Sequence, residues 1–344
     1  MRNSRSMYSL VPAKVARFFP GLLAVCALVS AAAIFSAGGG GVHAGQENEP
    51  AFTIKARSEL VLLDVSVRYP KDGFVGGLKR ENFEVFEEGR KEPITQFGSV
   101  DTPVTIGLVV DASGSMRPKR PEVVTAGLVF AKESNPHDEF FVVNFNDQVV
   151  FGLPGSMPFT DSLERLRHAL YYGPAAGRTS LYDAVAAALK HIRLGTREHR
   201  TLIIVSDGGD NASKISFDEL LQQIQGSLVT VYSVALVDPD DVESNLGVLR
   251  KISQTSGGEF FMVPGIDQVE SVFHQIAQNV RNRYTIGYVP DPALNRETAL
   301  RHIRVVATDD GRKLVVRTRT SYRLDATEDA ASDQGTISSL HPAH

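Results

Sequence analysis

The stretch Val104-Thr-Ile-Gly-Leu-Val-Val-Asp-Ala-Ser-Gly-Ser-Met116 decides the fold, because an apolar run ends there at an aspartate that two alternate serines follow. Its first seven residues carry no charge and are rich in valine and isoleucine. A strand without polar alternation is typical of a parallel sheet that is covered on both faces. The pattern predicts a buried parallel strand with Asp111, Ser113 and Ser115 at its carboxyl end, where α/β sheets bind ligands.

Strands and helices alternate along the chain after this stretch. Strand patterns occur at 104–110, 139–145, 148–151, 201–206, 228–236 and 259–263. Apolar residues recur every three or four positions, as in helices, at about 121–132, 162–172, 181–192, 217–225, 242–255 and 268–282. This alternation predicts an α/β fold with a doubly wound, mostly parallel sheet and helices on both faces.

Half-buried strands flank the α/β region on both sides. Before it, apolar residues over 57–69 alternate with Asp64, Ser66 and Arg68, which predicts an antiparallel strand with one solvated face. Beyond it, 284–288 and 314–323 show the same alternation. The second of these carries three arginines at alternate positions or nearly so, for which we expect a solvated basic face, or else a face for an acidic partner: Arg317, Arg319 and Arg323.

Neither set of flanking strands is large enough to form a core alone. We therefore expect the two sets to pair in one small all-β sandwich, into which the α/β domain is inserted. The expected boundaries are a leader over 1–44, a linker over 45–56, sandwich halves over 57–100 and 284–324, the α/β domain over 101–283 and a disordered tail over 325–344.

The first 44 residues have the features of an export signal. A basic stretch reaches Arg17, an apolar run follows, and small residues lead up to Ala44. We expect cleavage after Ala44 and a periplasmic, secreted or cell-surface protein; the alternative is an uncleaved anchor, because 20–37 is apolar and just long enough to span a bilayer. The single cysteine, Cys26, lies in this leader, so the mature chain has neither a disulfide nor a cysteine-ligated metal.

The charge of the chain argues against nucleic acid as a partner. The leader holds four basic residues and no acidic one, so its removal lowers the formal net charge from −4 by four, to −8. An acidic chain repels the phosphate backbone. Membrane contact is expected only if the N-terminal segment stays uncleaved.

Three polar clusters fall where strands end or helices begin: 111–115, Gly177-Arg-Thr-Ser180 and Ser206-Asp-Gly-Gly-Asp-Asn211. If the strands are parallel, all three clusters gather at one edge of the sheet. They offer two carboxylates and several hydroxyls, which suit a hard, oxygen-preferring cation such as Mg²⁺. Each cluster alone could equally be a helix cap or a turn. The nine histidines show no metal-ligand spacing, and we expect them, His199 included, at the surface.

These residues resemble the metal-ion-dependent adhesion site of von Willebrand factor type A domains. The resemblance covers about residues 100–283 and fills the five positions of the motif: Asp111, Ser113, Ser115, Thr179 and Asp207. The flanks, with Leu62-Asp-Val-x-Val67 and Tyr284-x-Ile-Gly-Tyr288, are similar to exported bacterial proteins related to von Willebrand factor type A.

The resemblance implies a site for Mg²⁺ or Mn²⁺. Ser113 and Ser115 would bind the ion directly, Thr179 directly or through water, and Asp111 and Asp207 mostly through water. An open position on the ion would then accept an aspartate or glutamate carboxylate from a protein partner. The function expected from this site is metal-dependent protein binding of the cell-adhesion type, without catalysis.

Two alternatives to adhesion remain open from the residues themselves. A strand-end aspartate with Mg²⁺ also occurs in phosphatases that use an aspartate nucleophile, but these need a second acid where this chain has Ser113. The chain also lacks the Gly-x-Ser-x-Gly and Gly-x-x-x-x-Gly-Lys-Ser/Thr motifs. The second alternative is a metal ion with a purely structural role.

Overall fold

The computed structural model describes residues 60–69, 73–99, 101–207, 209–237, 246–291 and 300–323. The expected leader, linker and tail lie outside these described residues. Within the described ranges, no helix is both long enough and apolar enough to cross a membrane.

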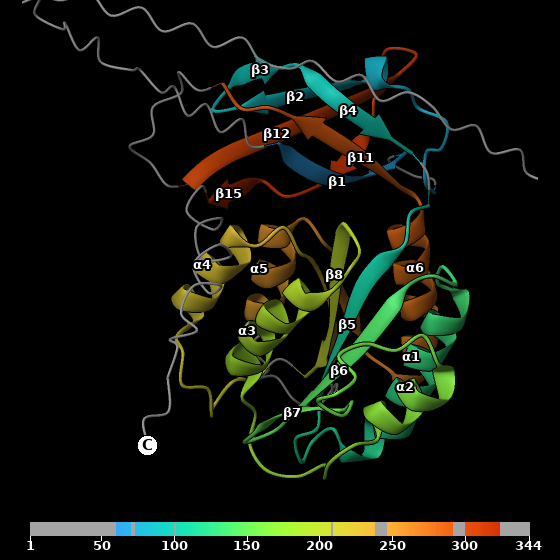
Figure 1. The fold of residues 1–344 in the computed structure, drawn as a ribbon, viewed down its shortest axis with the longest axis vertical. Coiled ribbons are helices and arrows are strands. Elements are labelled where there is room, and N and C mark those ends of the chain that lie inside the picture. The colour runs from blue at the N-terminus through green and yellow to red at the C-terminus, as the bar shows by residue number, and fades with distance from the viewer. Residues whose placement is uncertain are drawn as a thin grey trace, which may run out of the picture. The chain divides into compact units, whose positions relative to one another are not determined.

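A six-stranded sheet forms the centre of the α/β part, with the strand order β10-β9-β8-β5-β6-β7 (Figure 1). Neighbouring strands are parallel except for β6 and β7, which are antiparallel. The deciding stretch forms β5, and all of its residues are buried. The strands are β5 (Val104–Asp111), β6 (Glu139–Phe145), β7 (Val149–Phe151), β8 (His199–Ser206), β9 (Thr230–Leu236) and β10 (Phe260–Val263).

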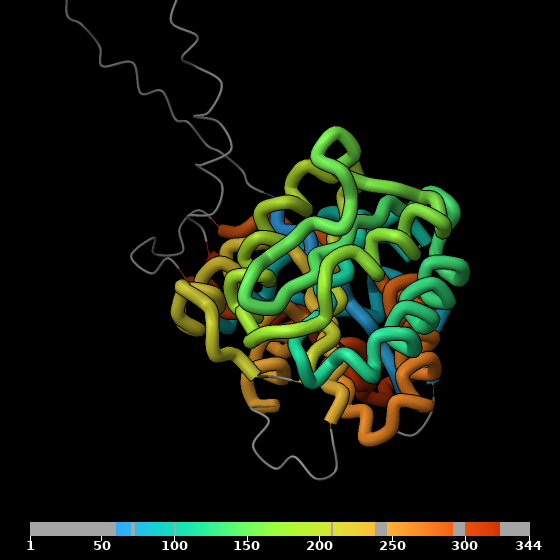
Figure 2. Tube along the Cα trace, turned by 90° about the horizontal axis from the view of Figure 1, so that it is seen from below, coloured from blue at the N-terminus to red at the C-terminus, as the bar shows by residue number. Residues whose placement is uncertain are grey.

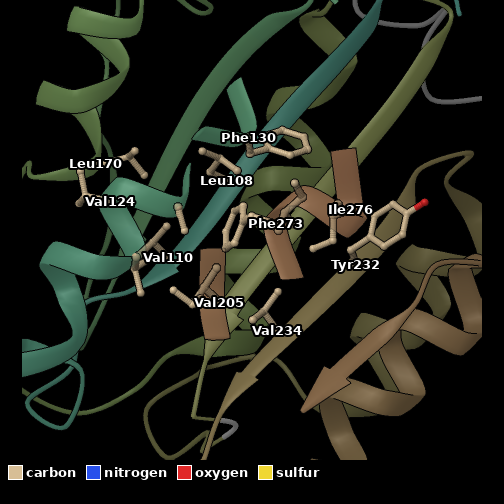
Figure 3. Packing of buried hydrophobic residues seen from close by; sticks show 14 of the residues in the cluster. Leu108, Val110, Val124, Phe130, Leu170, Val205, Tyr232, Val234, Phe273 and Ile276 are labelled. Atoms are coloured by element: carbon tan, nitrogen blue, oxygen red, sulfur yellow. The ribbon is translucent and has the colours of Figure 1, made fainter. Parts of the chain in front are cut away.

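Helices cover both faces of this sheet, as the sequence predicts. One face carries α1 (Arg120–Glu133), α2 (Leu163–Leu170) and α6 (Val269–Arg281), and the other carries α3 (Leu181–His191), α4 (Phe217–Gly226) and α5 (Leu246–Ser256) (Figure 1). On the first face, Phe130 and Phe273 pack against Leu108 and Val205 of the sheet (Figure 3). Short 3₁₀ turns occur at Arg80–Asn82, Arg117–Lys119, Ile192–Leu194 and Ile266–Gln268. The architecture is therefore the doubly wound α/β fold that the alternation predicts.

The flanking segments form two antiparallel sheets around a core of their own. The strand orders are β14-β1-β11-β4 and β13-β12-β2-β3, and β15 pairs with β12. Both sheets combine strands from before and after the α/β region, which confirms the predicted sandwich with an inserted domain. The strands are β1 (Val61–Arg68), β2 (Phe83–Glu87), β3 (Arg90–Glu92), β4 (Ile94–Gly98), β11 (Arg283–Tyr288), β12 (Leu300–Asp309), β13 (Arg312–Lys313), β14 (Val315–Arg317) and β15 (Ser321–Arg323).

Two expectations about polar faces are wrong. The segment 314–323 is not one strand but two short ones, and Arg319 between them is only 5% exposed rather than part of a solvated face. The polar face of β1 is not turned to water either, because Asp64 faces the amino-terminal ends of the parallel strands. Its carboxylate lies 2.8 Å from Nδ1 of His199 and 3.5 Å from Nε of Arg283. His199, expected at the surface, is 7% exposed.

Candidate metal site at the carboxyl edge of the sheet

Asp111 is the last residue of β5, and the chain turns sharply after it. The side chain is 1% exposed, and both of its carboxylate oxygens accept hydrogen bonds. The backbone N–H of Ser113 donates to Oδ1 at 2.8 Å, which closes the turn, and Oγ of Ser206 donates to Oδ2 at 2.7 Å. Because Ser206 ends the neighbouring strand β8, Asp111 is held between two strand ends.

The two serines after Asp111 connect it to the third cluster. Their hydroxyl oxygens lie 3.1 Å apart, and Oγ of Ser115 donates to Oδ2 of Asp207 at 2.5 Å. Ser113 is 2% exposed, whereas Ser115 is exposed and Asp207 is half-buried. The result is a row of oxygen atoms that runs from a buried carboxylate to a carboxylate in contact with solvent.

Thr179 is brought to the same edge by backbone contacts. The N–H of Gly114 donates to the carbonyl of Gly177 at 3.3 Å, which joins the loop after β5 to the loop before α3. Oδ1 of Asn211 accepts from the N–H of Thr179 at 2.9 Å, and the N–H of Asn211 donates to the carbonyl of Thr179 at 2.9 Å. Figure 2 views the molecule from this end. The three clusters that are far apart in the sequence are thus adjacent at the edge where the parallel strands end.

Burial raises the pKa of the Asp111 carboxyl to about 6, and the nearby charge of Asp207 raises it further, while the hydrogen bonds from Ser206 and Ser113 act to lower it. Two carboxyl groups so close to each other and partly out of water repel one another when both are ionised. A cation placed between them would remove this repulsion. The donor set fits a hard cation, since its atoms are carboxylate and hydroxyl oxygens.

Within the described residues, no group of three or more histidine, cysteine, aspartate or glutamate side chains could hold a metal ion. Any metal at this edge therefore depends on serine and threonine hydroxyls in addition to Asp111 and Asp207. Two further residues of the site were not predicted as part of it. Ser206 and Asn211 stand at the ends of the third cluster, and their strand-end and loop positions are the only signal that the sequence offers.

The family model for the von Willebrand factor type A domain matches residues 106–209, which contain all five positions of the proposed site. The chain is a von Willebrand factor type A domain protein. No curated protein matches the chain.

Solved structures with a similar fold come from several bacteria. They include a von Willebrand factor type A protein from Catenulispora acidiphila, at 14% identity and a TM-score of 0.47, which covers 70% of this chain and 76% of its own. An aerotolerance-related membrane protein from Bacteroides fragilis has 15% identity and a TM-score of 0.43, and covers 52% of this chain and 98% of its own. The von Willebrand factor domain of the type V pilus tip protein Mfa5 from Porphyromonas gingivalis has 12% identity and a TM-score of 0.44, with coverages of 53% and 96%.

Proposed function

We propose that the chain is an exported protein-binding module of the adhesion type, in which Mg²⁺ or Mn²⁺ mediates binding to a partner. The ion would be held by Asp111, Ser113, Ser115, Thr179 and Asp207. The observation that carries the proposal is the row of oxygens in which Ser113 and Ser115 join the edge of β5 to Asp207. A partner would supply an aspartate or glutamate carboxylate to the open side of the ion.

The charges of the site support binding rather than catalysis. Asp111 is already occupied by hydrogen bonds at both oxygens, and Asp207 accepts the proton of Ser115. Neither carboxylate is therefore left as a nucleophile, and Ser113 stands where a phosphatase of this type needs its second acid. With neutral hydroxyls next to the ion, the metal keeps enough positive charge to attract an anionic group of a partner.

The test is a titration of Mg²⁺ and of Mn²⁺ against the thermal stability of the wild-type protein and two variants. Saturation at a hundred times the Kd stabilises the fold by about 2.7 kcal/mol, so we expect the melting temperature to rise by several degrees. Ser115→Ala removes one hydroxyl at an exposed position and leaves both hydrogen bonds of Asp111 intact, and Asp111→Ala removes the central carboxylate. Both should lose the metal response. Ser156→Ala, at another exposed serine, is the matched control and should keep it.

The partner is tested separately by capture from the periplasm or the culture medium, in Mg²⁺ and in EDTA. A protein that the wild type retains in Mg²⁺ and releases in EDTA, and that Ser115→Ala does not retain, supports adhesion. Capture that is the same in both buffers would mean that the ion is structural. Phosphatase turnover that disappears with Asp111→Ala would favour the enzyme instead. N-terminal sequencing of the exported protein tests cleavage after Ala44.

A further inference from the structure

A cavity of about 500 Å³ lies far from the proposed metal site in the chain, between the end of α5, the beginning of β10 and the segment that includes β14. Its volume is within the range of small-molecule sites, and such sites occur preferentially where two parts of a fold meet. The lining residues are mostly polar. They include Arg250, Lys251 and Gln254 from α5, Glu259 before β10, and Arg317 and Thr320 from the second flank.

Positive charge prevails in this cavity. Arg250, Lys251 and Arg317 face a single carboxylate, that of Glu259. This carboxylate is fully engaged, because Oε1 lies 2.9 Å from Nη1 of Arg317 and Oε2 accepts from Nδ2 of Asn279 at 2.9 Å. The cavity therefore has a formal net charge of +2.

The two cations of α5 are available to a ligand. Both side chains belong to exposed residues, and neither forms an ion pair with any part of the chain that the structure describes. The guanidinium of Arg250 lies over the ring of Phe260, 4.5 Å from its centre, which fixes its place at the rim of the cavity. Stacking of this kind leaves the N–H groups of arginine free to donate to an anion.

A further cation lies behind the wall of the cavity. The backbone of Arg319 packs so closely on Gly257 that a Cβ there would collide with it. The guanidinium of Arg319 is 5% exposed, and its Nη1 and Nη2 have no hydrogen-bond partner. The end of α5 contributes charge of the opposite sign, but a helix end is equivalent to only about half an elementary charge, and the N–H of Gly258 already donates to the carbonyl of Ser253 at 2.9 Å. The cations therefore dominate the field in the cavity.

We propose that this cavity binds a small phosphorylated molecule that also carries hydroxyl groups, such as a sugar phosphate. A phosphate monoester has a charge of about −1.5 to −2 at pH 7, which matches the net charge of the cavity. Arg250 and Lys251 would bind its oxygens, and Gln254 and Thr320, both exposed, offer an amide and a hydroxyl for the rest of the molecule. A ligand in this place would touch both the α/β part and the sandwich, and so hold them together.

The test is calorimetric titration of glucose 6-phosphate and of glucose into the full chain, in EDTA and at constant ionic strength. EDTA removes divalent ions, so the result does not depend on the metal site. We expect saturable binding of glucose 6-phosphate, no binding of glucose, and an affinity about tenfold or more lower for Arg250→Gln with Lys251→Gln, since charge-assisted hydrogen bonds are lost. Lys190→Gln, an exposed lysine on α3, is the matched control and should bind as the wild type does.

Both substituted residues are exposed, so the double variant should unfold at the same temperature as the wild type when no ligand is present. Equal affinity of the double variant and the wild type would overturn the proposal. So would the absence of saturable binding to the wild type, or an affinity for glucose equal to that for its phosphate.

Discussion

The contact between β1 and the parallel sheet should make the stability of this protein depend on acid pH through one residue, Asp64. Burial by itself raises the pKa of this carboxyl, but the charges of Arg283 and His199, with a hydrogen bond from His199, outweigh burial and lower the pKa from 3.8 to about 2. The carboxylate is 16% exposed, so solvent screens these interactions only weakly. Ionised Asp64 is thus better stabilised in the folded chain than in the unfolded one.

The size and direction of the effect follow from linkage. Each pH unit between the folded and the unfolded pKa is worth about 1.4 kcal/mol, so ionised Asp64 adds about 2 kcal/mol to the free energy of unfolding. Because the folded pKa is the lower one, this contribution is complete above about pH 4 and is lost as the pH falls toward 2. At neutral pH, Asp64→Asn should cost at least this much, since it leaves Arg283 without its carboxylate.

The assay is urea unfolding of the wild type and of Asp64→Asn at a series of pH values between 7 and 2. We expect the difference in the free energy of unfolding to be constant down to about pH 4 and to shrink below it. Asp161→Asn, at an exposed aspartate, controls for the general effect of a lost carboxylate. A difference between wild type and Asp64→Asn that does not change with pH would refute the reasoning.

Three further predictions concern the α/β part. Gly107→Ala should destabilise the fold by about 1–3 kcal/mol, because a Cβ would overlap Phe141, whereas Gly155→Ala, with open space around it, should leave the urea midpoint unchanged. Ser216→Ala should lower the melting temperature, since the loss of an N-cap costs about 1 kcal/mol and Ser216 also forms a capping box at the start of α4. Burial raises the pKa of the Asp138 carboxyl to about 6, so the stability of the wild type relative to Asp138→Asn should be greatest below about pH 4 and fall as the pH rises through 6, in urea unfolding.

The central sheet could be predicted from the sequence because its strands are apolar throughout. The predicted strand over 104–110 differs from β5 only by the addition of Asp111. By contrast, β12 was not predicted although it has ten residues. Its buried face includes Arg301, which is 5% exposed, together with Ile303, Val305 and Ala307. A charged residue on the inner face obscures the alternation on which the prediction of a half-buried strand depends.

The candidate metal site could be predicted for a different reason. Its clusters follow strand ends, and a parallel sheet brings such ends together whatever the details of packing are. The hydrogen bonds within the site could not be predicted, because they depend on the rotamers of residues from different loops. The contact between Ser206 and Asp111 is an example, since it joins residues 95 positions apart in the chain.

The opposite edge of the sheet shows where the alternation rule fails. A strand with one polar face is expected to turn that face to water, but a polar face can equally meet a second polar surface. Asp64 on β1 does so at His199, and Arg317 on β14 does so at Glu259. Both contacts join the sandwich to the inserted domain, and both involve residues that the pattern alone assigns to solvent. The cavity lined by Arg250 and Lys251 belongs to the same polar contact, so a second ligand site can be found there only after the two flanks have been paired.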